Sequence, residues 1–198
     1  MRPREFDQDE VLRVAFEQFR RKGMRATSLT DIARDAGVQR GSLYNAFGSK
    51  EALFLRAYER YAGDYLKAAR TALGSGTLRE RLAAFFDLTI ANFRSGSPAR
   101  GCPTTRGLME VTSLDDQGPD EIARQAFADL LTRLTDLIEE ALSTGGAFDG
   151  DARRAALHIL AMTRGLAVLE RAYGDEAQLR AIAAGTIDLV LGGRAALT

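Results

Sequence analysis

The sequence of 198 residues has one cysteine, no tryptophan and only four prolines. A single thiol, Cys102, cannot form an intrachain disulfide, which excludes a disulfide-stapled secreted scaffold. The chain also lacks an apolar run of about 18 residues, the length of a transmembrane helix, and the opening MRPREFDQDE contains no apolar signal segment. We therefore expect neither membrane insertion nor secretion, and we expect the protein to be cytoplasmic.

Residues of the common catalytic sites are also scarce. The one histidine, His158, falls within a predicted helix, and the sequence has no phosphate-binding loop and no cluster of metal ligands. We therefore expect no enzymatic activity, no cofactor and no bound metal.

The formal net charge is zero, but the charges are unevenly divided along the chain. Residues 1–62 hold 12 basic and 9 acidic side chains, and the remainder holds 15 and 18. The amino-terminal third thus has a small positive excess, which suits contact with a nucleic-acid backbone.

Nearly every segment has the periodicity of an amphipathic helix, and strand patterns are almost absent. Helix starts resemble capping boxes, as at Ser28 with Asp31. The pattern predicts an all-α protein of about nine helices. We expect a three-helix head at residues 1–48, a connecting helix at 49–73 and a helical body at 74–198.

The most informative stretch is SLTDIARDAGVQRGSLYNAF at residues 28–47. Apolar residues including Ile32 repeat at helical spacing until Gly37, a residue able to adopt the left-handed conformation that ends a helix. A second helix follows, with Leu43 and Phe47 on its buried side. This spacing predicts a helix-turn-helix, whose second helix enters the major groove of DNA.

The outward residues of this unit combine cationic, amide and hydroxyl groups, although each also suits an ordinary solvated surface. Arg40 offers paired donors to guanine, and Gln39 and Asn45 offer the donor and acceptor that adenine requires. Gly41 is unfavourable within a helix and indicates close approach to DNA. Hydroxyls at a helix start bind phosphate. The predicted DNA-binding residues are Thr27, Ser28, Thr30, Gln39, Arg40, Gly41, Ser42, Tyr44, Asn45 and Lys50.

Residues 7–66, and above all TSLTDIARDAGVQRGSLYNAFGSKEALF at 27–54, resemble the amino-terminal domain of the TetR family of bacterial transcriptional regulators (TetR/AcrR-like). The resemblance rests on the DIA segment, the Ala-Gly-Val turn and the Gly-Ser-Leu-Tyr core of the third helix. It implies a transcriptional regulator that binds a palindromic double-stranded DNA operator as a homodimer. We expect a repressor that is released by a small-molecule, electrophile or oxidant effector, and an activator remains the open alternative. Members often have His or an aromatic residue where Asn45 and Ala46 stand here, so contacts at these two positions are not carried over.

The body contains Phe and Met residues beside small ones, a composition that suits either an apolar ligand pocket or a plain core. Cys102 precedes Pro103 at a predicted helix start, with Arg100 and Arg106 nearby in sequence. A thiol in such a place is a stronger nucleophile and can sense electrophiles or oxidants, although a lone cysteine can also be an inert core residue. The predicted effector pocket comprises Phe85, Phe86, Thr89, Phe93, Cys102, Met109, Phe127, Leu131, Met162 and Leu166.

The last two predicted helices carry regular rows of small and branched residues. Such rows pack either on the protein's own body or in a dimer interface, and the resemblance to the TetR family implies a four-helix dimer interface here. The predicted interface residues are Ala155, Ile159, Leu179, Ile182, Ala183, Thr186 and Val190. Two alternatives remain open: a ligand-binding helical protein with a degenerate DNA-binding head, or an enzyme.

Overall fold

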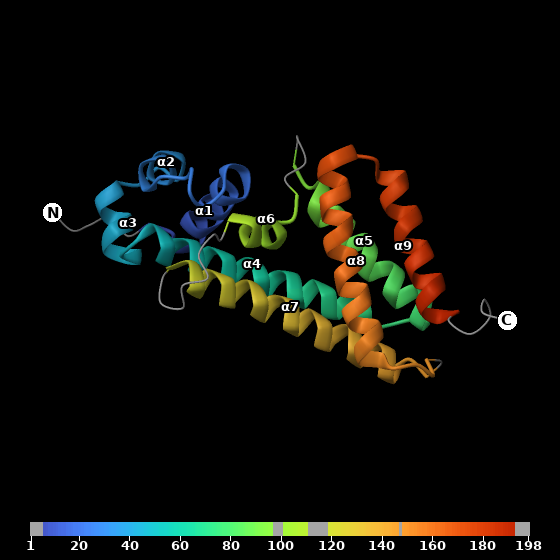
Figure 1. Ribbon diagram of the computed structural model, residues 1–198. Coiled ribbons are helices and arrows are strands. Elements are labelled where there is room, and N and C mark those ends of the chain that lie inside the picture. The colour runs from blue at the N-terminus through green and yellow to red at the C-terminus, as the bar shows by residue number, and fades with distance from the viewer. Residues whose placement is uncertain (1–5, 97–100, 111–118, 147, 193–198) are drawn as a thin grey trace. The chain divides into compact units, whose positions relative to one another are not determined.

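The computed structural model describes residues 6–96, 101–110, 119–146 and 148–192 (Figure 1). Within these ranges the chain forms nine α-helices and no strand, which confirms the predicted all-α fold. The helices are α1 (Gln8–Lys22), α2 (Leu29–Asp35), α3 (Arg40–Phe47), α4 (Lys50–Leu73), α5 (Leu78–Arg94), α6 (Pro103–Glu110), α7 (Pro119–Thr144), α8 (Ala152–Tyr173) and α9 (Glu176–Leu191). Among the described residues, no helix is long and apolar enough to span a bilayer.

Several helices begin at the capping residues that the sequence predicts. Ser28 accepts a hydrogen bond at 3.1 Å from the backbone N–H of Asp31 and starts α2. Thr77 and Glu80 form a complete capping box before α5, in which each side chain bonds the other residue's backbone N–H. These bonds satisfy amide groups that the first helical turn leaves without partners, so the chain enters each helix at a defined residue.

The chain divides into two compact units. The first comprises Met1–Asp64 and Arg106–Phe127, and the second comprises Tyr65–Thr105 and Ala128–Thr198. The boundaries between the units fall within α4, α6 and α7. The first unit thus includes a segment that the sequence pattern alone assigns to the body.

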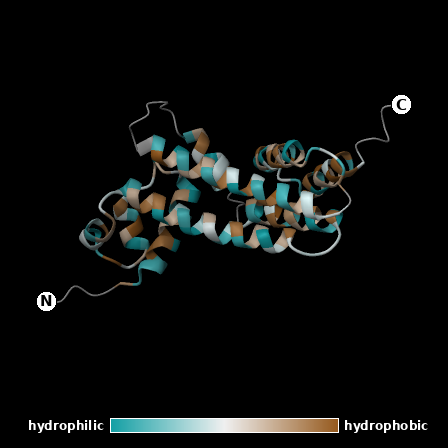
Figure 2. Cartoon of the chain, turned by 90° about the horizontal axis from the view of Figure 1, so that it is seen from below, coloured by the Kyte–Doolittle hydropathy of each residue, from teal (hydrophilic) through white to brown (hydrophobic). Residues whose placement is uncertain are grey.

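In the first unit, α1 packs against α2, and α2 packs against α3. Its core is aromatic: the rings of Phe19 and Phe54 meet edge to face at 5.1 Å, and Phe127 meets Tyr58 in the same way at 4.8 Å. Figure 2 shows the apolar faces of these helices turned toward one another and their polar faces turned outward. This packing supports the short helices α2 and α3, which are too short to be stable alone.

In the second unit, α5, α8 and α9 pack against one another. Phe85 and Phe93 of α5, Leu166 of α8 and Ile187 of α9 are buried in this core. The amphipathic pattern of each helix therefore marks the face that it turns toward its neighbours in the same chain.

Candidate nucleic-acid interface and effector site

The turn between α2 and α3 has the geometry of a Schellman motif. Gly37 adopts a left-handed φ of +66°, as the sequence predicts. The backbone N–H of Val38 donates to the carbonyl of Ala33 at 2.9 Å, and that of Gly37 donates to the carbonyl of Arg34 at 3.2 Å. These bonds satisfy the last carbonyls of α2 and fix the direction in which α3 leaves the turn.

Helix α3 buries one face and leaves the other open. Leu43 is fully buried and Phe47 is 7% exposed, whereas Tyr44 is 65% exposed although it is a large aromatic residue. Arg40 and Asn45 are also exposed. Of the remaining predicted DNA-binding residues on this unit, Gln39 and Gly41 are exposed and Ser42 is half-buried. Gln39 precedes α3, and its side chain makes no capping hydrogen bond. The outer face of α3 therefore presents a guanidinium, an amide and a phenol, which are groups that bind DNA bases and phosphates.

The hydroxyls before and within α2 divide into two groups. Thr27 is 2% exposed, and its hydroxyl donates to the carbonyl of Gly23 at 2.6 Å. This bond holds the turn between α1 and α2, which corrects the prediction that Thr27 binds phosphate. Ser28 and Thr30 are exposed at the amino end of α2, and Lys50 is half-buried at the start of α4, so these three remain predicted phosphate contacts.

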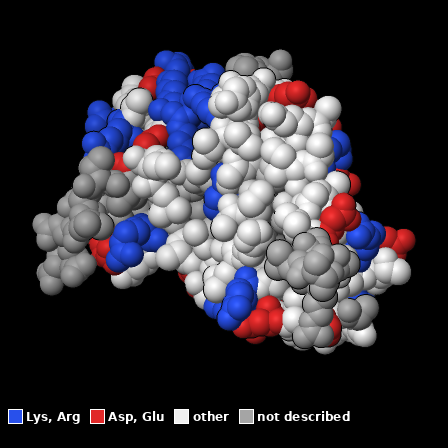
Figure 3. All heavy atoms as spheres, turned by 45° about the vertical axis from the view of Figure 1, so that its right-hand side comes forward, with Lys and Arg blue, Asp and Glu red and all other residues white. Residues whose placement is uncertain are grey.

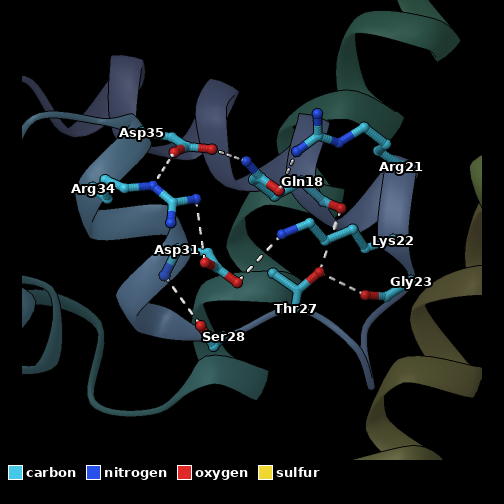
Figure 4. Close-up of polar contacts among 9 residues, drawn as sticks. All are labelled: Gln18, Arg21, Lys22, Gly23, Thr27, Ser28, Asp31, Arg34 and Asp35. Atoms are coloured by element: carbon cyan, nitrogen blue, oxygen red, sulfur yellow. Dashed lines mark hydrogen bonds and ion pairs between the residues drawn. The ribbon is translucent and has the colours of Figure 1, made fainter.

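A polar network joins α1 to α2 (Figure 4). Lys22 Nζ lies 3.3 Å from Asp31 Oδ2, and Arg34 contacts both Asp31 and Asp35. Gln18 donates from its amide nitrogen to the carboxylate of Asp35. Hydrogen bonding from Ser28 and then from Lys22 holds the pKa of the Asp31 carboxyl below its usual value, so this carboxylate stays ionised at neutral pH. The network fixes α2 on α1 and thereby the position of the turn that carries α3.

Gly41 does not relieve crowding within the chain. A Cβ atom built at Gly41 meets no heavy atom within 4 Å, and the same is true at Gly63 in α4. Crowding within the chain therefore does not require glycine at either position, and close approach of DNA at Gly41 stays a prediction.

We expect Gly41→Ala to strengthen the fold and weaken DNA binding. Alanine is favoured over glycine in a helix interior by about 1 kcal/mol, so the free energy of unfolding should rise by up to about that amount. The new methyl group should reduce operator affinity by about tenfold, which corresponds to about 1.4 kcal/mol. Thermal unfolding and fluorescence anisotropy measure the two effects. Gly63→Ala is the matched control and should show the stability gain alone; equal operator affinity in both variants would refute the close approach.

Cys102 lies at the amino end of α6 and is 5% exposed. Its sulfur accepts hydrogen bonds from the backbone N–H of Thr105 at 3.5 Å and from Arg164 Nη1 at 3.2 Å. The Arg164 guanidinium also lies over the ring of Phe93, at 6.0 Å from the centroid. Backbone dipoles and a cation therefore converge on this sulfur, as the predicted helix-start position implies, but the cation is 62 residues away in sequence.

Further polar groups lie near the sulfur. The Tyr65 hydroxyl lies 2.9 Å from Thr89 Oγ1, which itself donates to the carbonyl of Phe85. Burial raises the pKa of Tyr65, so its hydroxyl stays protonated at neutral pH. The Thr105 hydroxyl oxygen is buried and has no hydrogen-bond partner within the described part of the chain. This region thus combines a thiol with hydroxyl and guanidinium donors.

The predicted pocket residues do not all gather here. Phe85, Phe86, Thr89, Phe93 and Leu166 are buried in the second unit, and Leu131 and Met162 are half-buried in it. Met109 is 77% exposed, and Phe127 packs on Phe54 and Tyr58 in the first unit. The assignment of Met109 and Phe127, which belong to the first unit, to the pocket stays a prediction. Of the two cations close to Cys102 in sequence, Arg106 bonds the backbone of α1, and Arg100 lies outside the described residues.

A separate cavity of about 210 Å³ lies in the second unit. It is smaller than the usual ligand pocket of about 300–1,000 Å³. Its lining contains none of the predicted pocket residues and comprises Arg70, Leu73, Gly74, Arg81, Leu137, Glu140, Ala141 and Thr144.

The predicted dimer-interface residues lie largely in the chain's own core. Ile159, Leu179, Ala183 and Thr186 are at most 5% exposed, because α8 and α9 pack on each other and on α5. This burial corrects their assignment to an interface, and it leaves Ala155, Ile182 and Val190, which are half-buried. The exposed apolar residues of α8 and α9 lie on other faces and comprise Leu157, Val168, Tyr173 and Leu189. Figure 3, with the side that carries α8 and α9 turned forward, shows uncharged side chains over much of the visible face.

The fold and the exposed face of α3 define a helix-turn-helix regulator, and comparison with known proteins agrees. Residues 11–57 match the family model of the bacterial regulatory proteins of the tetR family, and residues 79–185 match that of the LmrA/YxaF-like transcriptional regulator carboxyl-terminal domain. The chain belongs to the TetR family of bacterial transcriptional regulators.

Two curated relatives are helix-turn-helix transcriptional regulators. The chain is 30% identical over 126 residues to the HTH-type transcriptional regulator YezE of Bacillus subtilis, covering 63% of this chain and 65% of YezE. It is 29% identical over 147 residues to the HTH-type transcriptional repressor NemR of Escherichia coli, covering 71% of this chain and 70% of NemR. The aligned region thus spans about two thirds of the length of these relatives.

Solved structures extend the likeness over nearly the whole chain. A cysteine mutant of the TetR-family regulator CifR, complexed with 26-bp operator DNA, superposes with a TM-score of 0.81 at 29% identity and covers 94% of this chain and 98% of its own. The reduced form of Escherichia coli NemR superposes with a TM-score of 0.79 at 24% identity, covering 90% of this chain and 94% of its own, and supports the fold.

Proposed function

We propose that this regulator is a homodimeric repressor that binds a palindromic operator through α3 and is released when an effector or an electrophile acts at Cys102. The observation that carries the proposal is the open face of α3, where Arg40, Tyr44 and Asn45 stand out from a helix anchored by Leu43 and Phe47. The operator complex of CifR supports DNA as the partner. Because its partner is the genome, we expect the protein to act in the cytoplasm.

A homodimer suits both the DNA and the exposed surface of the chain. Two recognition helices related by twofold symmetry read two half-sites of a palindrome. Leu157 and Val168 of α8 and Leu189 of α9 are each about half or more exposed, and exposed apolar patches mark interaction sites. We propose that these outer faces, together with the half-buried Ile182, form the interface in the body at residues 74–198.

Modification of Cys102 supplies a mechanism of release. In the reaction with an activated alkene, the sulfur bonds to the β-carbon and the α-carbon takes up a proton. The adduct adds several heavy atoms beside Arg164 and Phe93, where Cys102 is 5% exposed. Packed interiors accommodate extra atoms only by shifting side chains and backbone, so the start of α6 should move. The connecting helix at residues 49–73 is the proposed link to the head.

Titration of a preformed operator complex tests this function. With N-ethylmaleimide or with a member of a broad metabolite panel, operator affinity should fall about 5- to 150-fold, the usual range of allosteric coupling. Size-exclusion chromatography with light scattering should give two chains per duplex. An operator complex that neither thiol-reactive reagents nor the panel alters would contradict regulated release while leaving DNA binding intact.

A further inference from the structure

An exposed arginine of α4, Arg56, lies at the carboxyl end of the recognition helix within the first compact unit. Its guanidinium carbon is 5.8 Å from the centroid of the ring of Phe47, the last residue of α3. The ring of Phe47 also meets the ring of Phe6, at 6.4 Å between centroids, and Phe47 is 7% exposed. The side chain of Arg56 is therefore placed beside α3 although its backbone belongs to α4.

Other exposed arginines of this unit are neutralised within the chain. Arg60, one turn further along α4, lies 2.5 Å from a carboxylate oxygen of Asp9. Arg13 of α1 lies 2.5 Å from a carboxylate oxygen of Glu10. Arg56 makes no such ion pair with any residue in the described part of the chain. Its charge is therefore available to a partner outside the chain.

Two predicted DNA contacts are unpaired in the same way. Arg40 at the start of α3 and Lys50 at the start of α4 also make no ion pair with a described residue. Proteins bind DNA with such cations because each one neutralises a phosphate and releases a counterion. A cation that already holds a carboxylate gains less from a phosphate. Arg56 thus has the electrostatic character of the predicted contacts, although its sequence neighbours do not mark it as one.

The length of α3 brings its carboxyl end to the rim of the DNA groove. The eight residues of α3 span about 12 Å, whereas the major groove is about 8.5 Å deep. A recognition helix places its amino-terminal residues against the base edges. The carboxyl end of such a helix then lies near the phosphates that line the groove, and Arg56 stands over the residue at that end.

We propose that Arg56 binds a phosphate at the rim of the groove that α3 enters, with the ring of Phe47 as its support. A guanidinium over an aromatic ring is held by a cation–π interaction and still has N–H groups that can donate two parallel bonds to a phosphate. The support also orders the long side chain before DNA binds, which lowers the entropy cost of binding. The contact sets affinity and register without reading sequence. This inference rests on the proposed function, from which it takes DNA as the partner of α3.

Arg56→Met tests the contact, because methionine can still cover Phe47 but carries no charge. The probe is the duplex that the wild type selects from a random pool. Each lost phosphate contact lowers the slope of log affinity against log salt by about 0.9, so a homodimer should lose about 1.8 and bind at least about tenfold more weakly at physiological salt. An unselected duplex should lose affinity by the same factor.

Two further variants separate the phosphate contact from other effects of the substitution. Arg56→Lys keeps the charge and should keep the salt slope of the wild type. Arg60→Met is the matched control, since it removes the same charge from the same helix, where Asp9 already neutralises it. Its salt slope should also match that of the wild type. A purely structural role of Arg56 on Phe47 would lower the unfolding temperature of Arg56→Met and leave its salt slope unchanged.

Ethylation interference locates the contact on the DNA. Ethylation neutralises single phosphates, and at one position in each half-site it should block the wild type but not Arg56→Met. An unchanged salt slope in Arg56→Met, an equal loss of slope in Arg60→Met, or the same interference pattern in Arg56→Met and the wild type would overturn the inference. A wild type that prefers no sequence, with the loss of slope still confined to Arg56→Met, would support the phosphate contact and contradict the proposed reading of an operator by α3.

Discussion

Replacing Arg40 and Tyr44 together by alanine is expected to reduce operator affinity by about 100-fold or more. A bidentate arginine–guanine contact contributes about 1–3 kcal/mol of discrimination, or about 5- to 150-fold, and loss of the phosphate contact that we predict for Tyr44 should add to this. Both side chains are exposed, and the buried residues of α3 are Leu43 and Phe47. The fold should therefore survive the double substitution. Fluorescence anisotropy with a labelled operator measures the loss.

The two single variants separate base reading from positioning. Arg40→Ala should relax the preference for guanine at one position of each half-site, whereas Tyr44→Ala should weaken binding to all sequences alike. The double variant should keep the thermal unfolding temperature, the dimer and the response of Cys102 to thiol reagents. Arg133→Ala, at an exposed arginine of α7, controls for the lost charge. Unchanged operator affinity in the double variant would show that α3 does not read DNA.

Replacing Cys102 by serine is expected to abolish release by electrophiles. Serine keeps a small polar atom at the start of α6 and can accept the bonds from Thr105 and Arg164, but its hydroxyl does not add to activated alkenes at neutral pH. Operator affinity of the untreated variant should match that of the wild type. After N-ethylmaleimide, only the wild type should lose operator binding.

Arg164→Met shows whether the guanidinium activates the thiol. Loss of the cation 3.2 Å from the sulfur should slow alkylation of Cys102 several-fold, as measured by mass spectrometry over time. A serine variant that alkylating reagents still release would locate the sensing elsewhere in the protein.

Local signals in the sequence are sufficient to predict the helices and the helix-turn-helix formed by α2 and α3. Ser28 caps α2, Gly37 ends it in a left-handed conformation, and Leu43 with Phe47 marks the buried side of α3. Each of these signals depends on residues within one or two helical turns. Thr27 shows the limit of this reasoning, because its hydroxyl bonds to Gly23 and Gln18 of the preceding turn and helix, and local composition does not reveal that burial.

Contacts between distant residues have no such local signal. Arg164 reaches Cys102 across 62 residues, and Arg106 reaches the end of α1 across 86. Periodicity likewise identifies the buried face of a helix without identifying what buries it. The regular apolar row of α9 that includes Leu179 and Ala183 is therefore compatible with packing against a second chain or against the protein's own helices. In the structure these two residues are buried where α9 packs on α5 and α8.

Selection of preferred sequences from a random pool of duplex DNA tests most directly whether α3 reads an operator as part of a dimer. The wild type should enrich an inverted repeat whose half-site centres are separated by about one helical turn, roughly 10 bp, or a multiple of it. A footprint on both half-sites with two chains bound should accompany it. Enrichment of no sequence above the starting pool, or of a single unrepeated site bound by one chain, would contradict a homodimeric DNA-reading regulator.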